Sequence, residues 1–240
     1  MAAAAIGTVS LMAFLIFVYS GSLGVIRLGM NELERLVFNG VISLAFFLQH
    51  SGMIRKPFRR RLNRFVPSHY QGAAYTVASG LVLLAFVLLW QGSDMILLEV
   101  HGLAGHVMGI FFFLSILGMG WGMWALRSID MFGLDSIIRN LRSKETPWRP
   151  FTIRGPYRWV RHPLYLFMIV IFWSSPILTA DRLLFNVLWT TWVFVGTILE
   201  ERDLVGDFGD SYRDYQSRVP MLLPRGVRPA YPGGRAGNGV

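Results

Sequence analysis

Two polar clusters, separated along the chain by apolar sequence, contain the residues with the most evident capacity for chemistry. The first is Gly155-Pro-Tyr-Arg-Trp-Val-Arg-His-Pro-Leu-Tyr165, and the second begins at Glu200 and Glu201 and continues to Tyr215. Arginine binds carboxylates and phosphates, and histidine transfers protons near neutral pH. An apolar hairpin between the clusters would return both to one membrane face. We therefore interpret them as the two halves of one site.

The first cluster leads into an apolar segment that Pro163 would begin, because proline is favoured at the first position of a helix. Arg161 and His162 would then lie at the positive end of the helix dipole, which with Arg158 suits an anionic group. The alternative is that Arg158 and Arg161 anchor the chain to lipid headgroups. His162 is harder to explain as an anchor.

Glu200 and Glu201 would end the last apolar helix, where the dipole disfavours carboxylates. They therefore need a compensating partner, which is Arg161, Arg202 or a cationic ligand. One interpretation is ordinary salt bridging. The functional one is that one glutamate holds a cationic or hydroxyl-rich ligand while the other pairs with protein.

Four tyrosines flank these groups: Tyr157, Tyr165, Tyr212 and Tyr215. Tyr157 and Tyr165 would line an aromatic wall. Tyr212 and Tyr215 are three residues apart and would share one face of a short helix over 210–218. They would stack on a planar ring or pack against the membrane surface.

Other histidines lie upstream of the two clusters. Gln49 and His50 form a polar pair near membrane depth, which is costly and often functional, although headgroups would also solvate it there. A neutral His50 or His162 could accept a proton. His101 and His106 are five residues apart and do not share a helix face, so we predict no metal site.

The composition indicates a membrane protein. The chain has 240 residues, of which 53% are hydrophobic and only 15% charged, whereas soluble domains are about a quarter charged. We predict an all-α, polytopic membrane helical bundle with five or six transmembrane helices and a cytosolic C-terminal segment. The apolar stretches lie near residues 5–26, 36–54, 71–90, 101–126, 164–180 and 183–199. The last two are close to the lower limit of about 17 residues for a span.

The basic residues predict the orientation. The connection Arg55–Arg64 is basic and has no acid, whereas Gln91–Val100 carries only acidic charges. Because basic loops stay in the cytoplasm, the two clusters should face the cytoplasm from a bacterial inner membrane. The net charge is +9, and we expect the basic residues to interact with membrane lipid and not with nucleic acid. Cysteine is absent, which excludes disulfides, thiolate metal sites and a cysteine nucleophile.

The domain prediction is one membrane-embedded domain over residues 1–224, followed by a disordered tail over 225–240 that is rich in proline, glycine and arginine. Gly118-Met-Gly-Trp-Gly122 lacks the dinucleotide spacing and is assigned to close helix packing. A short amphipathic helix is expected around residues 132–141. The sequence indicates no oligomeric state.

The ordered motifs carry a family resemblance. They are Gly155–Tyr165, Glu200-Glu-Arg-Asp-Leu204, Phe208-Gly-Asp-Ser-Tyr-Arg-Asp-Tyr215 and Val219-Pro-Met-Leu-Leu-Pro224. This series resembles the integral-membrane methyltransferase superfamily, which includes isoprenylcysteine carboxyl methyltransferase and phospholipid N-methyltransferases. Shorter stretches are similar to the bacterial methanethiol S-methyltransferases: Phe47-Leu-Gln-His-Ser51, Arg64-Phe-Val-Pro67 and Ile129-Asp-Met-Phe-Gly-Leu134.

The resemblance implies S-adenosylmethionine as cofactor, bound between the cytosolic ends of the last helices and the C-terminal segment, and a small thiol as substrate. The matching cofactor-binding positions are Tyr157, Arg158, Arg161, His162, Pro163, Tyr165, Glu200, Glu201, Tyr212 and Tyr215. The catalytic candidates are His162, Glu201, Arg161 and His50.

Other functions remain open at this point. The same fold could methylate an isoprenylcysteine carboxylate or a lipid amine, and a related membrane reductase would use a nicotinamide cofactor. A non-enzymatic scaffold would bind anionic lipid through its basic loops.

Overall fold

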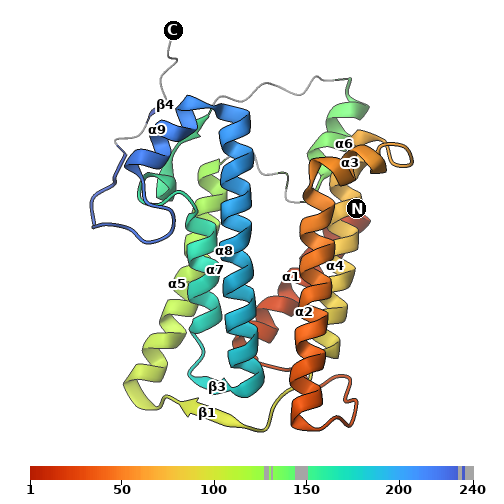
Figure 1. Cartoon of the computed structure of the whole chain (residues 1–240), viewed down its shortest axis with the longest axis vertical. Helices are drawn as coiled ribbons and strands as arrows, with labels where there is room; N and C mark the ends of the chain where they lie inside the picture. Colours follow the sequence, from red (N-terminus) through yellow and green to blue (C-terminus); the bar gives the residue numbers. More distant parts are fainter. Residues whose placement is uncertain (127–129, 131, 144–150, 232–233, 236–240) are drawn as a thin grey trace. The chain divides into compact units, whose positions relative to one another are not determined.

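The computed structural model describes residues 1–126, 130, 132–143, 151–231 and 234–235 (Figure 1). The chain forms two compact units. The first unit contains Met1–Val100, Asp130–Pro147 and Ile177–Trp189, and the second contains His101–Ile129, Trp148–Pro176 and Thr190–Val240. The prediction of a single domain over residues 1–224 stays a prediction.

The described chain is mainly helical, which confirms the predicted class. Five of its helices are long and apolar enough to cross a membrane. They are α1 (Ala2–Ser20), α2 (Glu32–Ile54), α4 (Gln71–Leu89) with the preceding η1 (Ser68–Tyr70), α5 (Gly102–Leu126) and α8 (Ala180–Phe208). The segment expected over 164–180 instead forms the short helix α7 (Pro163–Trp173). At 1.5 Å per residue α7 is about 16 Å long, roughly half a bilayer core.

Short elements complete the fold. The helices are α3 (Lys56–Leu62), α6 (Leu134–Leu141), η2 (Gly155–Arg158) and α9 (Asp210–Arg218). The predicted helices over 132–141 and 210–218 are thus confirmed. Two small antiparallel sheets, which the sequence did not predict, add to them. β1 (Ile96–Glu99) pairs with β3 (Ile177–Thr179), and β2 (Thr152–Ile153) pairs with β4 (Gly234–Arg235).

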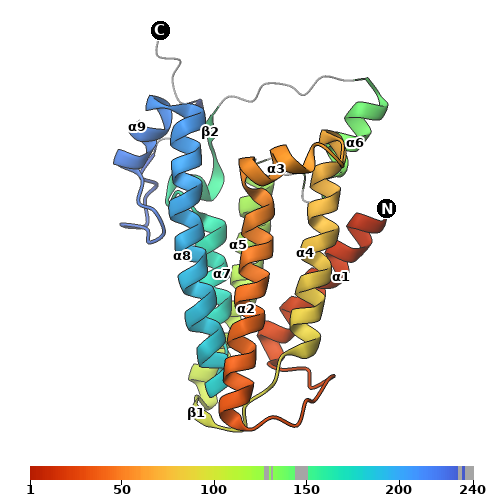
Figure 2. The same ribbon diagram turned by 45° about the vertical axis from the view of Figure 1, so that its right-hand side comes forward.

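In the first unit, α4 packs against both α1 and α2, and α3 lies across the end of α2 (Figure 2). Small residues bring α1 and α4 close together. A Cβ atom on Gly80 of α4 would lie only 2.8 Å from the Cγ2 atom of Ile6 in α1. Small residues are a usual means of packing membrane helices, because helices in lipid associate mainly through van der Waals contact.

An aromatic core fills the rest of the first unit. The rings of Phe17 and Trp90 lie 5.4 Å apart, and Phe46 stacks on Trp189 at 5.1 Å. Phe185 lies 5.0 Å from Trp189 and so brings the first turns of α8 into the same core. Aromatic pairs at such distances stabilise by about 0.5–1.5 kcal/mol beyond the burial of their area.

The turn before α6 docks this helix onto α4. The carboxylate of Asp130 accepts hydrogen bonds from the N–H groups of Leu134 and Asp135, both at 2.8 Å. Gly133 has φ 67°, and a Cβ atom there would lie 2.1 Å from the backbone of Gly72. Two backbones therefore touch at a place where neither residue has room for a side chain.

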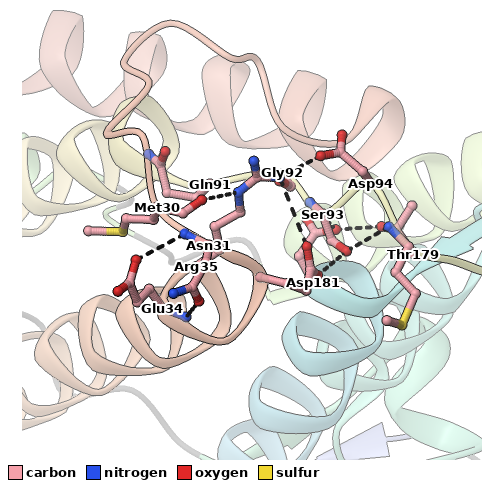
Figure 3. Close-up of polar contacts among 12 residues, drawn as sticks. Met30, Asn31, Glu34, Arg35, Gln91, Gly92, Ser93, Asp94, Thr179 and Asp181 are labelled. Atoms are coloured by element: carbon pink, nitrogen blue, oxygen red, sulfur yellow. Dashed lines mark hydrogen bonds and ion pairs between the residues drawn. The ribbon is translucent and has the colours of Figure 1, made fainter.

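A polar cluster closes the loops at the start of α8 (Figure 3). Asp181 is 4% exposed and accepts hydrogen bonds from Trp90 Nε1 at 2.8 Å, the Ser93 N–H at 3.0 Å and Thr179 Oγ1 at 2.5 Å. Beside it, Arg35 donates to Asp94 at 2.8 Å. We call Asp181 with Trp90, Ser93 and Thr179 the Asp181 cluster.

In the second unit, α7 lies between α5 and the later part of α8 (Figure 1, Figure 2). The predicted packing role of Gly118 and Gly122 is confirmed. A Cβ atom on Gly118 would lie 2.5 Å from the ring of Phe167, and one on Gly122 would lie 2.7 Å from Leu164. Large apolar side chains elsewhere on α5 are exposed, as expected for a helix facing lipid.

Candidate active site

The Arg161-His162-Pro163 turn enters α7 as the sequence predicts. Pro163 is the first residue of α7 and His162 is its N-cap. The turn is reached from η2, which begins at Gly155 with φ 53°. A Cβ atom on Gly155 would lie 2.7 Å from Ala125 of α5, so this position requires glycine for both conformation and space.

Arg161 meets Glu201 of α8 in a two-pronged ion pair. Arg161 Nε donates to Glu201 Oε1 at 2.5 Å, and Nη2 donates to Oε2 at 3.1 Å. The Arg161 side chain is 11% exposed and that of Glu201 is 13% exposed. The remaining guanidinium nitrogen, Nη1, donates to the carbonyls of Gln216 and Val219. Two segments far apart in the sequence are therefore joined, and the Arg161 side chain makes four hydrogen bonds within the protein.

His162 lies against the same carboxylate. Its Nε2 atom is 3.1 Å from Glu201 Oε1, and Nδ1 is 3.8 Å from Glu200 Oε2. Burial lowers the pKa of His162 below its usual 6.5 and outweighs the two glutamates, which act to raise it. The imidazole is therefore neutral at neutral pH, and its contact with Glu201 is a hydrogen bond and not an ion pair.

Glu200 differs from its neighbour in exposure. Its Oε2 atom accepts a hydrogen bond of 2.6 Å from the Tyr165 hydroxyl, and its side chain stays 44% exposed. The ring of Tyr165 stacks on that of His162 with an interplanar angle of 9°. Glu200 is thus a carboxylate held in place on one side and accessible on the other.

Two side chains of α9 also contact the Glu201 carboxylate. Gln216 Nε2 donates to Glu201 Oε2 at 3.0 Å, and the Tyr212 hydroxyl lies 3.5 Å from Oε1. Sequence reasoning missed Gln216. Its only signal was a position four residues after Tyr212, on the same helix face.

The tyrosines lie in a small core and not at an open surface. Tyr212 and Tyr215 are buried with Ile153 and Val219, and the Tyr215 hydroxyl donates to the Tyr157 carbonyl at 2.6 Å. Burial raises the pKa of each of Tyr157, Tyr212 and Tyr215, so all three phenols stay protonated. The predicted packing of Tyr212 and Tyr215 against the membrane surface is wrong, because both rings are buried within the protein.

His50 belongs to the first unit. Its ring stacks on Phe46 at 5.1 Å, and the Tyr75 hydroxyl lies 2.9 Å from Nε2. The neighbouring Gln49 donates to Ser79 at 3.2 Å. The second unit thus brings together the ten predicted cofactor-binding positions, and His50 has a polar setting of its own.

In the described parts of the chain, no group of three His, Asp or Glu side chains is arranged to hold a metal ion.

The segment expected to be a disordered tail differs from that expectation in its described part. The Tyr231 N–H donates to the Arg158 carbonyl at 3.1 Å, and Arg158 Nε donates back to the Tyr231 carbonyl at 3.0 Å. β4 also pairs with β2. Backbone hydrogen bonds hold this segment although its composition gives it little apolar surface to bury. Residues 232–233 and 236–240 lie outside the described residues.

Comparison with known proteins shows the family of the chain. Residues 101–211, which include the first polar cluster and both Glu200 and Glu201, match the family model described as phospholipid methyltransferase. With its membrane helices, the protein is therefore an integral-membrane methyltransferase.

Relatives narrow the class. A methanethiol S-methyltransferase of a Pseudomonas species is 34% identical and covers 79% of this chain and 74% of its own length. The methanethiol S-methyltransferase of Mycobacterium tuberculosis is 34% identical, and the match covers 80% of this chain and 79% of that enzyme. Methanethiol S-methyltransferase 1 of Bradyrhizobium diazoefficiens is also 34% identical, and the match covers 80% of this chain and 67% of that enzyme. The chain belongs to the methanethiol S-methyltransferase family. No solved structure matches it.

Proposed function

We propose that this chain transfers a methyl group from S-adenosylmethionine to the sulfur of methanethiol and so forms dimethyl sulfide. The choice of methanethiol as the acceptor is supported by the relatives, which are named methanethiol S-methyltransferases. The observation that carries the proposal is the meeting of the Arg161-His162 turn with Glu200 and Glu201, in which Glu200 keeps an accessible carboxylate.

The donor set of the site fits S-adenosylmethionine. Glu200, steadied by Tyr165, offers a carboxylate to an ammonium group or to ribose hydroxyls. The positive end of α7 suits the carboxylate of the amino-acid part. Arg161 uses four of its five side-chain N–H donors on Glu201 and two carbonyls, so we assign it to hold Glu201 in place. Tyr212 and Tyr215 support the site through their packing.

When bound, S-adenosylmethionine supplies a methyl group on a sulfonium sulfur, whose transfer to a thiol sulfur releases the thiol proton. The chain aligns the acceptor, excludes water and accepts that proton, and alignment alone contributes up to about 7–11 kcal/mol in ideal cases. With its N–H on Nε2, donating to Glu201, neutral His162 carries its lone pair on Nδ1. We assign proton acceptance to this atom. His50 stays a second prediction for the role.

We place the site at the cytoplasmic face of a bacterial inner membrane. Arginines are frequent in the segments that carry the site residues: Arg154, Arg158, Arg161, Arg202, Arg213 and Arg218. Enrichment of lysine and arginine at one end of membrane helices marks the cytoplasmic side.

The test uses purified protein in lipid nanodiscs with methyl-labelled S-adenosylmethionine and methanethiol. Labelled dimethyl sulfide in the headspace is the expected product, and Glu200→Gln should reduce its rate. If no labelled product forms and calorimetry detects no binding of S-adenosylhomocysteine, the proposal is wrong.

A lipid amine is the second candidate acceptor, because the matching family model is described as phospholipid methyltransferase. The same assay with an aminophospholipid, and with an isoprenylcysteine peptide, separates the acceptors. If label enters the lipid fraction faster than the headspace, the acceptor is a lipid and not methanethiol, and the cofactor assignment is unchanged.

A further inference from the structure

The chain after α9 folds back along the turn that carries Arg161 and His162. The Arg161 N–H donates to the Pro220 carbonyl at 2.9 Å, and the His162 N–H donates to the Met221 carbonyl at 3.1 Å. We call residues 219–231 the C-terminal strap. Its first residues are thus bonded to the backbone of the site turn.

A second attachment lies at the other end of the strap. Trp159 Nε1 donates to the Val227 carbonyl at 2.9 Å. Tyr231 exchanges two hydrogen bonds with Arg158, one through each backbone group of Tyr231. The ring of Tyr231 meets Tyr215 edge to face at 6.2 Å, and the guanidinium carbon of Arg218 lies 5.8 Å from its centre. Tyr231 is therefore an anchor with both backbone and side-chain contacts.

The side chain of Arg161 depends on the same region. Its Nη1 atom donates to the carbonyls of Gln216 and Val219, immediately before and at the start of the strap. Both the backbone and the guanidinium of Arg161 are therefore fixed by residues 216–220. If this stretch were loose, Arg161 would lose the restraint that aims it at Glu201.

We propose that the C-terminal strap, anchored by Tyr231, positions Arg161 and His162 for cofactor binding. Tyr231 is then a positioning residue for methyl transfer. The proposal rests on the proposed function for its consequence in catalysis, but the restraint on the turn is measurable without any cofactor.

The main variant is Tyr231→Ala, which removes the ring contacts with Tyr215 and Arg218. We expect the affinity for S-adenosylhomocysteine to fall about tenfold and the KM for S-adenosylmethionine to rise similarly, with kcat retained at saturation. A chain ending at Pro224 should lose about a hundredfold, because it also lacks the bonds to Trp159 and Arg158. A purely structural role would lower the melting temperature without changing KM.

Two control variants separate positioning from general damage. Val227→Ala changes a side chain that is 95% exposed and keeps the carbonyl that accepts from Trp159, so affinity should be unchanged. Tyr231→Phe keeps the ring and should restore the affinity lost in Tyr231→Ala. Trp159→Phe, which loses the bond from Nε1 to the strap but keeps an aromatic ring, should have an intermediate effect.

Hydrogen exchange of the peptide containing Arg161 and His162, measured without cofactor, completes the test. It should be faster in Tyr231→Ala than in Val227→Ala. Unchanged exchange in Tyr231→Ala overturns the proposal, whether or not the wild type binds S-adenosylhomocysteine. Faster exchange with unchanged affinity also overturns it. If exchange is faster in Tyr231→Ala but the wild type does not bind S-adenosylhomocysteine, the restraint by the strap is supported and the proposed function is wrong.

Discussion

Helix α8 carries two acidic sites that use their hydrogen bonds differently. Near its start, Asp181 receives three neutral donors on its two carboxylate oxygens: Trp90, Ser93 and Thr179. Figure 3 shows Ser93 and Thr179 beside it. The Asp181 cluster is closed, with donors from α4's end, the following loop and β3. Such satisfied polar clusters fix the relative positions of chain segments.

Near the end of α8, Glu201 receives the charged Arg161 and the neutral His162, and the adjacent Glu200 keeps 44% of its side chain exposed. Here the Glu201 carboxylate is hydrogen-bonded within the protein, whereas the Glu200 carboxylate remains accessible to a ligand. The difference suggests a general criterion: a saturated buried acid indicates architecture, whereas a held but accessible acid beside it indicates binding.

The largest expected effect comes from Glu201→Ala. It leaves the mostly buried Arg161 without its carboxylate, which should cost about 3–5 kcal/mol of unfolding free energy and abolish methyl transfer. Denaturant unfolding and turnover measure the two effects. A variant that keeps wild-type stability would show that Arg161 does not depend on Glu201, and the contrast with Glu200 would then fail.

Asp181→Asn is the matching change in the closed cluster. The amide cannot accept all three hydrogen bonds, so unfolding free energy should fall by about 1–3 kcal/mol. Because the cluster is assigned to architecture, the folded variant should bind S-adenosylhomocysteine with wild-type affinity. Weakened binding at a temperature where the variant is folded would contradict this assignment.

Glu200→Gln sharpens the comparison from the other side. It removes the charge but keeps an oxygen for Tyr165, so the affinity for S-adenosylmethionine should fall about tenfold, or about 1.4 kcal/mol. Stability should change by less than about 0.5 kcal/mol, as for exposed positions in general. Calorimetry and thermal unfolding of one preparation give both values. A large loss of stability with unchanged affinity would reverse the roles of Glu200 and Glu201.

The smallest effect is the pH dependence that His162 contributes. Because burial lowers its pKa in the folded state, the unfolded chain binds more protons as the pH falls below 6.5. Stability should therefore decrease toward acid, by at most about 1.4 kcal/mol per pH unit from this group. The melting temperature of the wild type should fall more steeply between pH 7 and 5.5 than that of His162→Gln. Parallel curves would show that His162 is not held neutral.

The meeting of the two polar clusters was accessible from sequence because it follows from chain geometry. Apolar segments on either side of Asp181 imply a hairpin, and Pro163 marks where its first helix begins. Arg161 was one of the partners predicted for Glu200 and Glu201, and the structure confirms its pairing with Glu201. The predicted reason was wrong, because α8 does not end at these glutamates. Two helix ends were wrong, because α7 ends earlier than predicted and α8 continues past Glu200 and Glu201 to Phe208. Apolar composition alone does not show where a helix ends.

The features that were missed depend on partners distant in the sequence or on backbone groups. β3 is defined by its pairing with β1, which no local pattern indicates. The C-terminal strap is bonded through carbonyls of residues such as Met221 and Val227, and side-chain composition carries no record of such bonds. The contact of Gln216 with Glu201 required the placement of α9.

The Asp130 turn bears on how acceptor specificity is traced through the family. Asp130 caps α6 and Gly133 touches Gly72, while Phe132 packs close to Gly7 of α1. This motif was among those that pointed to thiol methylation, yet in the described residues its contacts are those of a joint between helices. In this chain the motif therefore serves as a joint between helices, and the residues that set acceptor preference should be sought at other positions.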